Sequence, residues 1–298
     1  FTGFPWGAGG YAHIDGWLAG AAPWVGVYGM GALAAFVAMR LAWLRVGPQR
    51  RWRALGLLAL VFAGARHLPG VDHFTQPAGT SAVELLQANI AQTEKFEDMS
   101  GIRDALRWYG ERLLASDQPL VIAPETAVPV LPRHLPQGYW HALETHFAQR
   151  QQMALIGVPW GDAVQGQRLA PNICYEDLFG EELAARFGPD ELAPTVLVNV
   201  SNIGWFGNTV AVDQHLNISR MRALELGRPM LRATNTGATA IIDHRGQVQG
   251  LLPRFTRGSL MGTFEGRTGL TPYARWAAAF GLWPLWVLAL LVVGWAVW

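Results

Sequence analysis

The chain has 298 residues, a formal net charge of +1, 51% hydrophobic residues and 15% charged residues. The charged fraction is well below the roughly 25% of an average soluble domain, and the near-neutral balance excludes an electrostatic nucleic-acid binder. One cysteine excludes a disulfide scaffold, and the high hydrophobic content excludes a disordered chain. Its 14 tryptophans favour a membrane interface, where indole rings settle.

Three apolar stretches predict membrane-spanning helices. The first, residues 23–43, carries one charge and is long enough to cross a bilayer core of about 30 Å. The second, residues 54–65, reaches that length if it extends over 52–68 with its flanking arginines at the interface. The third, residues 276–298, carries no charge and has tryptophan at both ends. Buried core helices are the alternative, but they rarely run this long.

Arginines set the predicted orientation in the membrane. Four of them lie in residues 45–53, between the first two apolar stretches, and loops rich in arginine stay in the cytoplasm. The first span therefore runs inward and the second outward, which places residues 71–275 outside. The segment around Phe1 looks like an interfacial loop rather than a natural start, so we expect further spans before it.

The long segment between the second and third spans has a different sequence pattern. Short β-branched runs alternate there with helical patterns, which predicts a layered α/β domain that, at roughly 180 residues, buries its own core. We therefore divide the chain into a membrane region (1–80), an α/β domain (81–262), and a return segment with the last transmembrane helix (263–298). The predicted strands are 83–90, 120–125, 153–159, 195–202, 230–235 and 238–244, and the predicted helices are 98–114, 178–187 and 210–226.

Two residues stand out as candidates for chemistry. Cys174 lies in NICYED, between an apolar run and a helical pattern. A cysteine at a strand end or a helix N-terminus has a lowered pKa and reacts as thiolate, whereas a small buried hydrophobic residue is the alternative. Glu125 ends another strand, at the sheet edge where α/β folds place their sites. An ordinary loop carboxylate is the alternative for this residue.

Other constellations carry less weight. Ser201, Asp213 and His215 would suit a serine hydrolase, but the sequence around Ser201 lacks the glycines of a nucleophile elbow. His141 and His146 have the wrong spacing for a zinc pair on one helix face, and HExxH and phosphate-binding glycine loops are absent. We therefore expect no metal and no cofactor.

Taken together, eight motifs resemble the bacterial apolipoprotein N-acyltransferases, membrane-bound members of the nitrilase (carbon–nitrogen hydrolase) superfamily. They run in the order of the family and span almost the whole chain. They are FTGFPW (1–6), QANIAQTEKF (87–96), APETAVP (123–129), CYEDLFGEE (174–182), NVSNIGWFG (199–207), QHLNISRMRALELGRPMLRATNTGATAII (214–242), PRFTRG (253–258) and TGLTPYAR (268–275).

The resemblance implies a nitrilase-type α-β-β-α sandwich flanked by transmembrane helices, in a multi-pass protein of the bacterial inner membrane with its catalytic domain on the periplasmic face. It implies two partners, a phospholipid acyl donor and a diacylglyceryl apolipoprotein acceptor. The acyl chain passes through a cysteine thioester to the N-terminal amine of the diacylglyceryl-cysteine. Such a covalent intermediate lets two substrates react without meeting.

The resemblance also implies site residues. In the family's Glu–Lys–Cys triad, Glu125 matches the general base and Cys174 the nucleophile. Glu176 matches a residue that helps to position the nucleophile. The aromatic side chains of Tyr175, Trp205 and Phe206 are candidates for substrate binding, as a lip that faces lipid, and loop packing is the alternative reading of the last two.

The triad lysine is missing from the sequence. Lys95, the only lysine, lies in another motif, and the stretch from Gly157 to Cys174 has none. Arg168 in that stretch cannot readily cycle a proton. One interpretation is an inactive relative. We favour the other, in which a mobile lysine-bearing loop belongs in this stretch and the backbone is broken somewhere in residues 159–170.

Two other classes of function stay open. A membrane-anchored amidase or nitrilase would use water as the acceptor in place of a lipid amine. A non-catalytic membrane scaffold would fit if the lysine is truly absent.

Overall fold

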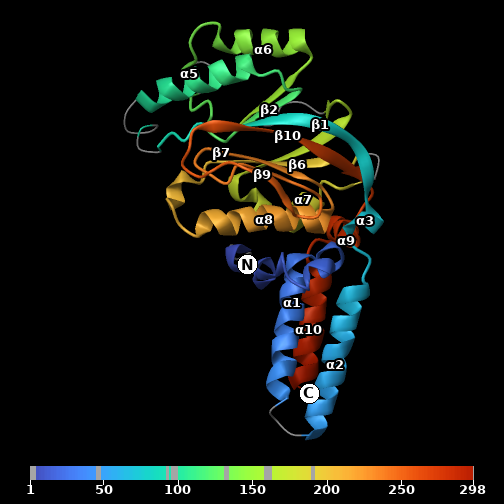
Figure 1. Cartoon of the computed structure of the whole chain (residues 1–298). Helices are drawn as coiled ribbons and strands as arrows, with labels where there is room; N and C mark the ends of the chain where they lie inside the picture. The colour runs from blue at the N-terminus through green and yellow to red at the C-terminus, as the bar shows by residue number, and fades with distance from the viewer. Residues whose placement is uncertain are drawn as a thin grey trace.

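The computed structural model describes residues 5–44, 48–91, 94, 100–130, 134–157, 163–188 and 192–297. Two sheets pack face to face between two layers of helices, and long helices project from one side of this domain (Figure 1). The α-β-β-α sandwich implied by the resemblance is confirmed. The chain enters beside the domain and ends at the far tip of the projecting helices (Figure 1).

The first sheet has four strands in the order β10-β1-β2-β3. Strand β1 lies between an antiparallel partner, β10, and a parallel partner, β2. Two helices, α5 and α6, cover the outer face of this sheet (Figure 1). The bounds are β1 Gln76–Gln87, β2 Leu120–Ala123, β3 Met153–Ile156, β10 Gly258–Thr268, α5 Ser100–Ala115 and α6 Tyr139–Arg150.

The second sheet has six strands in sequence order, from β4 to β9. Its centre, β5-β6-β7, is parallel, and antiparallel strands complete both edges. Helices α7 and α8 cover its outer face (Figure 1). The bounds are β4 Ala163–Val164, β5 Gln167–Ile173, β6 Val196–Ser201, β7 Met230–Thr234, β8 Ala240–Ile242, β9 Val248–Leu251, α7 Gly180–Ala184 and α8 Ala211–Leu226.

Shorter elements connect these layers. Two of them, η5 and η6, directly follow strands of the second sheet and become important for the site. The bounds are η1 Pro5–Gly7, η2 Gly9–His13, η3 Ala19–Ala21, α3 Val71–Phe74, η5 Cys174–Leu178 and η6 Ile203–Phe206.

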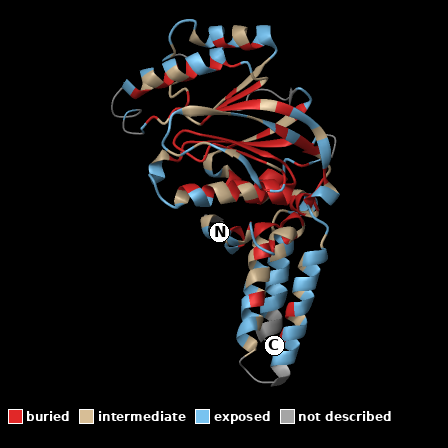
Figure 2. Ribbon diagram, in the orientation of Figure 1, coloured by how far each residue is buried: buried red, intermediate tan, exposed pale blue. Residues whose placement is uncertain are grey.

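Burial explains why apolar runs became central strands. Every residue of β2, β6 and β7 is buried, because each of these strands has layers on both faces. Figure 2 shows this burial concentrated in the strands and in α8. Val83, Leu85 and Ile122 of the first sheet pack on Val198 and Val200 of the second. Each such side chain contributes about 1.5–3 kcal/mol when it leaves water.

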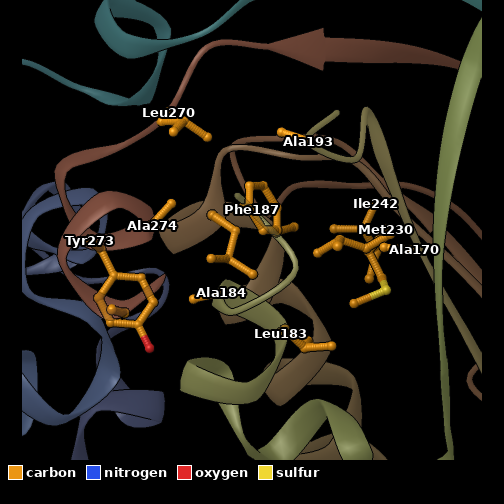
Figure 3. Packing of buried hydrophobic residues seen from close by; sticks show 14 of the residues in the cluster. Ala170, Leu183, Ala184, Phe187, Ala193, Met230, Ile242, Leu270, Tyr273 and Ala274 are labelled. Atoms are coloured by element: carbon orange, nitrogen blue, oxygen red, sulfur yellow. The ribbon is translucent and has the colours of Figure 1, made fainter. Parts of the chain in front are cut away.

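A second core lies between the six-stranded sheet and its helices. Phe187, which follows α7, and Met230 of β7 meet Tyr273 and Ala274 there (Figure 3). The last two residues belong to α9, Pro272–Phe280. The segment that leads into the last helix is therefore part of the α/β domain's packing.

Of the described residues, one helical stretch, Ala19–Trp43, is long and apolar enough by itself to cross a membrane. It contains α1, Ala22–Trp43, and agrees in position with the first predicted helix. The second forms α2, Pro48–His67, which lacks the required apolarity. The third is not one helix: α9 and α10, Trp283–Val297, meet at a bend of 89°. A single helix over residues 276–298 is therefore not observed, because Gly281 adopts a positive φ and α9 packs into the domain core; the two helices together are apolar enough for one broken span.

All six predicted strands are confirmed in position, as β1, β2, β3, β6, β7 and β8. The hairpin β4–β5 turns at Gln165 and Gly166, which both have a positive φ. The backbone runs through this hairpin from Ala163 to Ala170 without a break. The remainder of the expected loop, residues 158–162, lies outside the described residues.

The projecting helices are joined to the domain through a buried carboxylate. Gly26 has a φ of 65° and kinks α1, which frees the N–H of Val27 from the helix ladder. Glu225 of α8 accepts that N–H at 2.9 Å and pairs with Arg222 at 3.1 Å. Both charged side chains are fully buried. Burial raises the pKa of Glu225 to about 7, and the Arg222 charge opposes this shift.

We predict that Gly26→Ala destabilises this joint. An added Cβ would lie 2.4 Å from the ring of Tyr273 and would sit on a positive-φ residue. Overpacking and backbone strain together cost on the order of 2–5 kcal/mol. Thermal unfolding in detergent measures the loss. Gly56→Ala in α2 is the matched control, because its Cβ meets nothing within 4 Å. Equal melting temperatures for the two variants would contradict the prediction.

Candidate active site

The six site residues expected from the sequence line one cavity of about 510 Å³. They come from different elements: the turn after β2, the η5 turn after β5, and η6 after β6. Strands β5 and β6 are parallel neighbours, so the turns at their carboxyl ends lie side by side, and Glu125 reaches them from the end of β2 in the facing sheet. The six residues are Glu125, Cys174, Tyr175, Glu176, Trp205 and Phe206.

Cys174 begins the η5 turn in an unusual backbone conformation. Its φ is 51°, in the left-handed region that non-glycine residues rarely adopt. The side-chain amide of Asn199 donates a hydrogen bond to the Cys174 carbonyl at 2.9 Å, which ties the turn to strand β6. A sharp turn of this kind lifts the thiol out of the sheet and into the cavity.

Glu125 reaches the same cavity from the first sheet. Its carboxylate accepts the backbone N–H of Asn202 at 3.1 Å, and the Asn202 side chain donates to the Thr126 hydroxyl at 2.8 Å. These bonds join the carboxyl end of β2 to that of β6. The carboxylate is therefore held in place by the facing sheet rather than by its own loop alone.

Glu176 has a structural contact that the sequence did not reveal. Its carboxylate accepts the backbone N–H of Ile173 at 2.7 Å and so closes the η5 turn around Cys174. The residue lines the cavity as well. It is placed to fix the turn rather than to exchange a proton with the thiol.

Aromatic side chains form the mouth of the cavity. Trp205, Tyr175 and Phe206 are 70%, 54% and 44% exposed, which is high for such large apolar groups. Trp6, from the segment that leads into α1, packs on Phe206 with ring centroids 5.4 Å apart. The mouth therefore lies beside the chain that enters the first membrane helix.

The thiol is protonated in the resting site. Burial, and then the neighbouring Glu125 carboxylate, raise the pKa of Cys174 to about 11, against the opposing charge of Arg232. The expectation of a lowered pKa is thus wrong. Cys174 opens a five-residue turn rather than a long α-helix, and a carboxylate lies beside it. The site can work only by transferring the proton as the thiol attacks.

Two alternatives that the sequence already argued against are not supported by the geometry. His215 pairs with Asp177 at 2.8 Å, whereas Asp213 pairs with Arg254, so no serine triad assembles. Ser201 is fully buried. In the described ranges no cluster of potential metal ligands occurs, and His141 and His146 form none.

The lysine expected from the triad is not seen at the site. Lys95 and residues 158–162 both lie outside the described residues. The described part of the cavity wall accordingly contains no lysine.

Sequence reasoning missed the polar layer beneath the nucleophile. Asp177, His215 and Arg232 are at most 1% exposed and hydrogen-bond to one another. Asn199 and Asn202, which hold the two candidate catalytic turns, were missed too. Polar residues at 199 and 232 interrupt otherwise apolar strands, and this interruption is the signal that could have identified them.

Comparison with known families agrees with this geometry. The carbon–nitrogen hydrolase family matches residues 69–273, and the apolipoprotein N-acyltransferase N-terminal domain matches residues 1–40. A solved CN-hydrolase superfamily protein from Xanthomonas campestris, 16% identical, covers 68% of this chain and 96% of its own, with a TM-score of 0.48.

Two curated relatives are similar over nearly the whole chain. Apolipoprotein N-acyltransferase of Verminephrobacter eiseniae is 47% identical over 95% of this chain and 68% of its own length. That of Ralstonia nicotianae is 41% identical over 92% and 64%. The chain thus spans about two thirds of these relatives. The first alignment has 362 positions, 64 more than the 298 residues here, so the relative holds at least that many residues without a counterpart. The chain belongs to the apolipoprotein N-acyltransferase family of carbon–nitrogen hydrolases.

Proposed function

We propose that this chain transfers an acyl group from a phospholipid to the N-terminal amine of a diacylglyceryl apolipoprotein. One observation carries the proposal: a half-buried thiol and a carboxylate share a cavity whose aromatic mouth lies beside the segment entering α1. A soluble substrate would not require large apolar groups at the mouth. Family membership supports the same activity.

In the first step, the sulfur of Cys174 attacks the ester carbonyl of the phospholipid. The S–C bond forms, the ester C–O bond breaks, and a lysophospholipid leaves. Glu125 accepts the thiol proton and passes it to the departing oxygen. A thiol with a pKa of about 11 is protonated at neutral pH, so this transfer has to accompany the attack.

In the second step, the α-amine of the acceptor attacks the thioester. The N–C bond forms and the C–S bond breaks, and Glu125 carries a proton from the amine back to sulfur. The thioester conserves the acyl group between two lipid substrates that occupy the site in turn. Glu176 keeps the η5 turn closed through its bond to Ile173, while Tyr175, Trp205 and Phe206 contact the acyl chains.

The reaction develops an oxyanion, which preorganised donors or positive charge stabilise by about 3–4 kcal/mol each. We propose that a lysine in a segment between Gly157 and Cys174 supplies such charge. The residues of the aligned relative that have no counterpart here are compatible with such a segment.

The gene sequence tests this lysine directly. Reading the codons between Gly157 and Cys174 is expected to reveal an inserted segment with at least one lysine. Contiguous codons matching the present sequence would instead favour an inactive relative, which is the second function that the missing lysine supports.

We predict that the protein expressed from its gene forms an acyl-enzyme at Cys174. Incubation with phospholipid vesicles should add the mass of one acyl chain, seen by intact-protein mass spectrometry. Cys174→Ala should abolish this addition, and Glu125→Gln should slow it by about 10²–10⁴-fold, the usual contribution of a general base.

Asp213→Asn is the matched control for the loss of a carboxylate. Asp213 is paired with Arg254 and does not line the cavity, so the variant should acylate at the wild-type rate. Acyl addition that persists in Cys174→Ala would show that the nucleophile is wrongly assigned.

We further propose that the protein lies in the bacterial inner membrane, with residues 81–262 forming a periplasmic catalytic domain. The arginines of residues 45–53 support this orientation, since they mark the loop between α1 and α2 as cytoplasmic.

Thiol labelling tests the orientation, because Cys174→Ala removes the only native cysteine. In that background, Gln247→Cys in the exposed turn before β9 should react with a membrane-impermeant maleimide in intact spheroplasts. Trp52→Cys at the start of α2, 72% exposed, should react only after permeabilisation. The reverse pattern would overturn the proposed topology.

A further inference from the structure

A buried polar network is attached to the turn that carries Cys174, and neither chemical step above uses it. Its five side chains come from η5, β6, α8 and β7, so it joins the turn that carries the thiol to three elements of the second sheet's layer. All five are at most 1% exposed: Asp177, Asn199, His215, Ser219 and Arg232. Burying so many polar groups is costly unless each is partnered.

The hydrogen bonds fix the state of the imidazole. A guanidinium can only donate, so the 2.9 Å contact from Arg232 Nη2 makes His215 Nδ1 an acceptor. His215 Nε2 then carries the proton and donates to Asp177 at 2.8 Å. Burial and the Arg232 charge both lower the pKa of His215, which supports the neutral form. The ring therefore bridges a fixed cation to a fixed anion.

The same guanidinium orients the Asn199 side chain, which hydrogen-bonds to the Cys174 carbonyl. Arg232 Nη1 donates to the Asn199 side-chain oxygen at 3.0 Å, which leaves the Asn199 amide nitrogen to face Cys174. That nitrogen donates to the Cys174 carbonyl at 2.9 Å. Asp177, four residues into the η5 turn, ties its other end to Ser219 at 2.6 Å. Both ends of the strained turn are thus attached to the network.

The charged groups around Cys174 support the same role for Arg232. Asp177 and Arg232 approach within 3.5 Å, and Glu125 adds a second carboxylate near the thiol. Among the described residues, Arg232 is the cation whose charge favours the thiolate of Cys174.

We propose that Arg232, oriented by His215 and Asp177, is a positioning residue of this active site. Through Asn199 it holds the turn that presents the Cys174 thiol, and it supplies a fixed positive charge that favours the thiolate as it forms. The inference rests on the proposed function only for its use in acyl transfer. The geometric and electrostatic effect on the thiol stands independently of any substrate.

Alkylation of Cys174 by iodoacetamide tests the proposal without lipid, and the chain's single cysteine makes the readout specific. In detergent at pH 8.5, Arg232→Met should react about tenfold more slowly than wild type, because losing the charge raises the thiol pKa by about one unit. Arg232→Lys should recover most of that rate, since it restores the charge. An Arg232→Met variant that melts normally and reacts at the wild-type rate would overturn the proposal.

Arg228→Met is the matched control. Arg228 is equally buried but donates to the carbonyls of Gly227 and Gly269, away from the cavity, so its loss should leave the alkylation rate unchanged. Equal slowing in both variants would mean a general loss of structure and would refute the specific role.

A second variant covers the case in which Arg232→Met does not fold. His215→Gln should slow alkylation by about threefold, because the guanidinium remains but loses the acceptor that orients it. An unchanged rate in this variant would also overturn the proposal. Slowed alkylation in a protein that forms no acyl-enzyme would retain the positioning role and reject the proposed function.

Discussion

The apposition of a half-buried thiol and a carboxylate is the constraint on which this molecule depends. Cys174 and Glu125 come from different sheets, so their contact exists only while the two sheets stay packed face to face. Burial of Cys174, and then the neighbouring Glu125 carboxylate, raise the pKa of the thiol to about 11. A thiol with a raised pKa is less reactive toward alkylating and oxidising agents.

The same packing explains how a membrane anchor can belong to the site. The kink at Gly26 gives up one helical hydrogen bond, and Glu225 of α8 accepts the freed N–H. Helix α8 also carries His215, which packs on Trp6 at the cavity mouth. Helix α8 therefore contacts α1 through Glu225 and the cavity through His215.

The sequence predicted the layered α/β fold, and all six site residues proposed from it line the cavity. It succeeded because buried parallel strands are continuous apolar runs, and because residues at their carboxyl ends meet at one edge. The hairpin β4–β5 and the strands β9 and β10 were missed, since their polar, half-exposed residues resemble loops. The bend before α10 was missed because apolar composition alone does not distinguish helix α9, packed in a domain core, from a membrane span.

The site's polar support could not have been predicted from local patterns. Asp177, His215 and Arg232 are far apart in the sequence, and only the parallel crossover through α8 brings them together. The raised thiol pKa escaped prediction because its causes, first burial and then the Glu125 carboxylate across the two sheets, are not visible in the residues around Cys174.

The most direct test of the account is the fate of the isolated acyl-enzyme. Wild-type protein carrying one acyl chain would be separated from phospholipid and mixed with a short peptide that begins with diacylglyceryl-cysteine. The account predicts that the acyl mass leaves the protein and appears on the peptide, and that acetylating the peptide's α-amine blocks the transfer. Loss of the acyl group to water at the same rate with and without the peptide would contradict acyl transfer and identify a hydrolase.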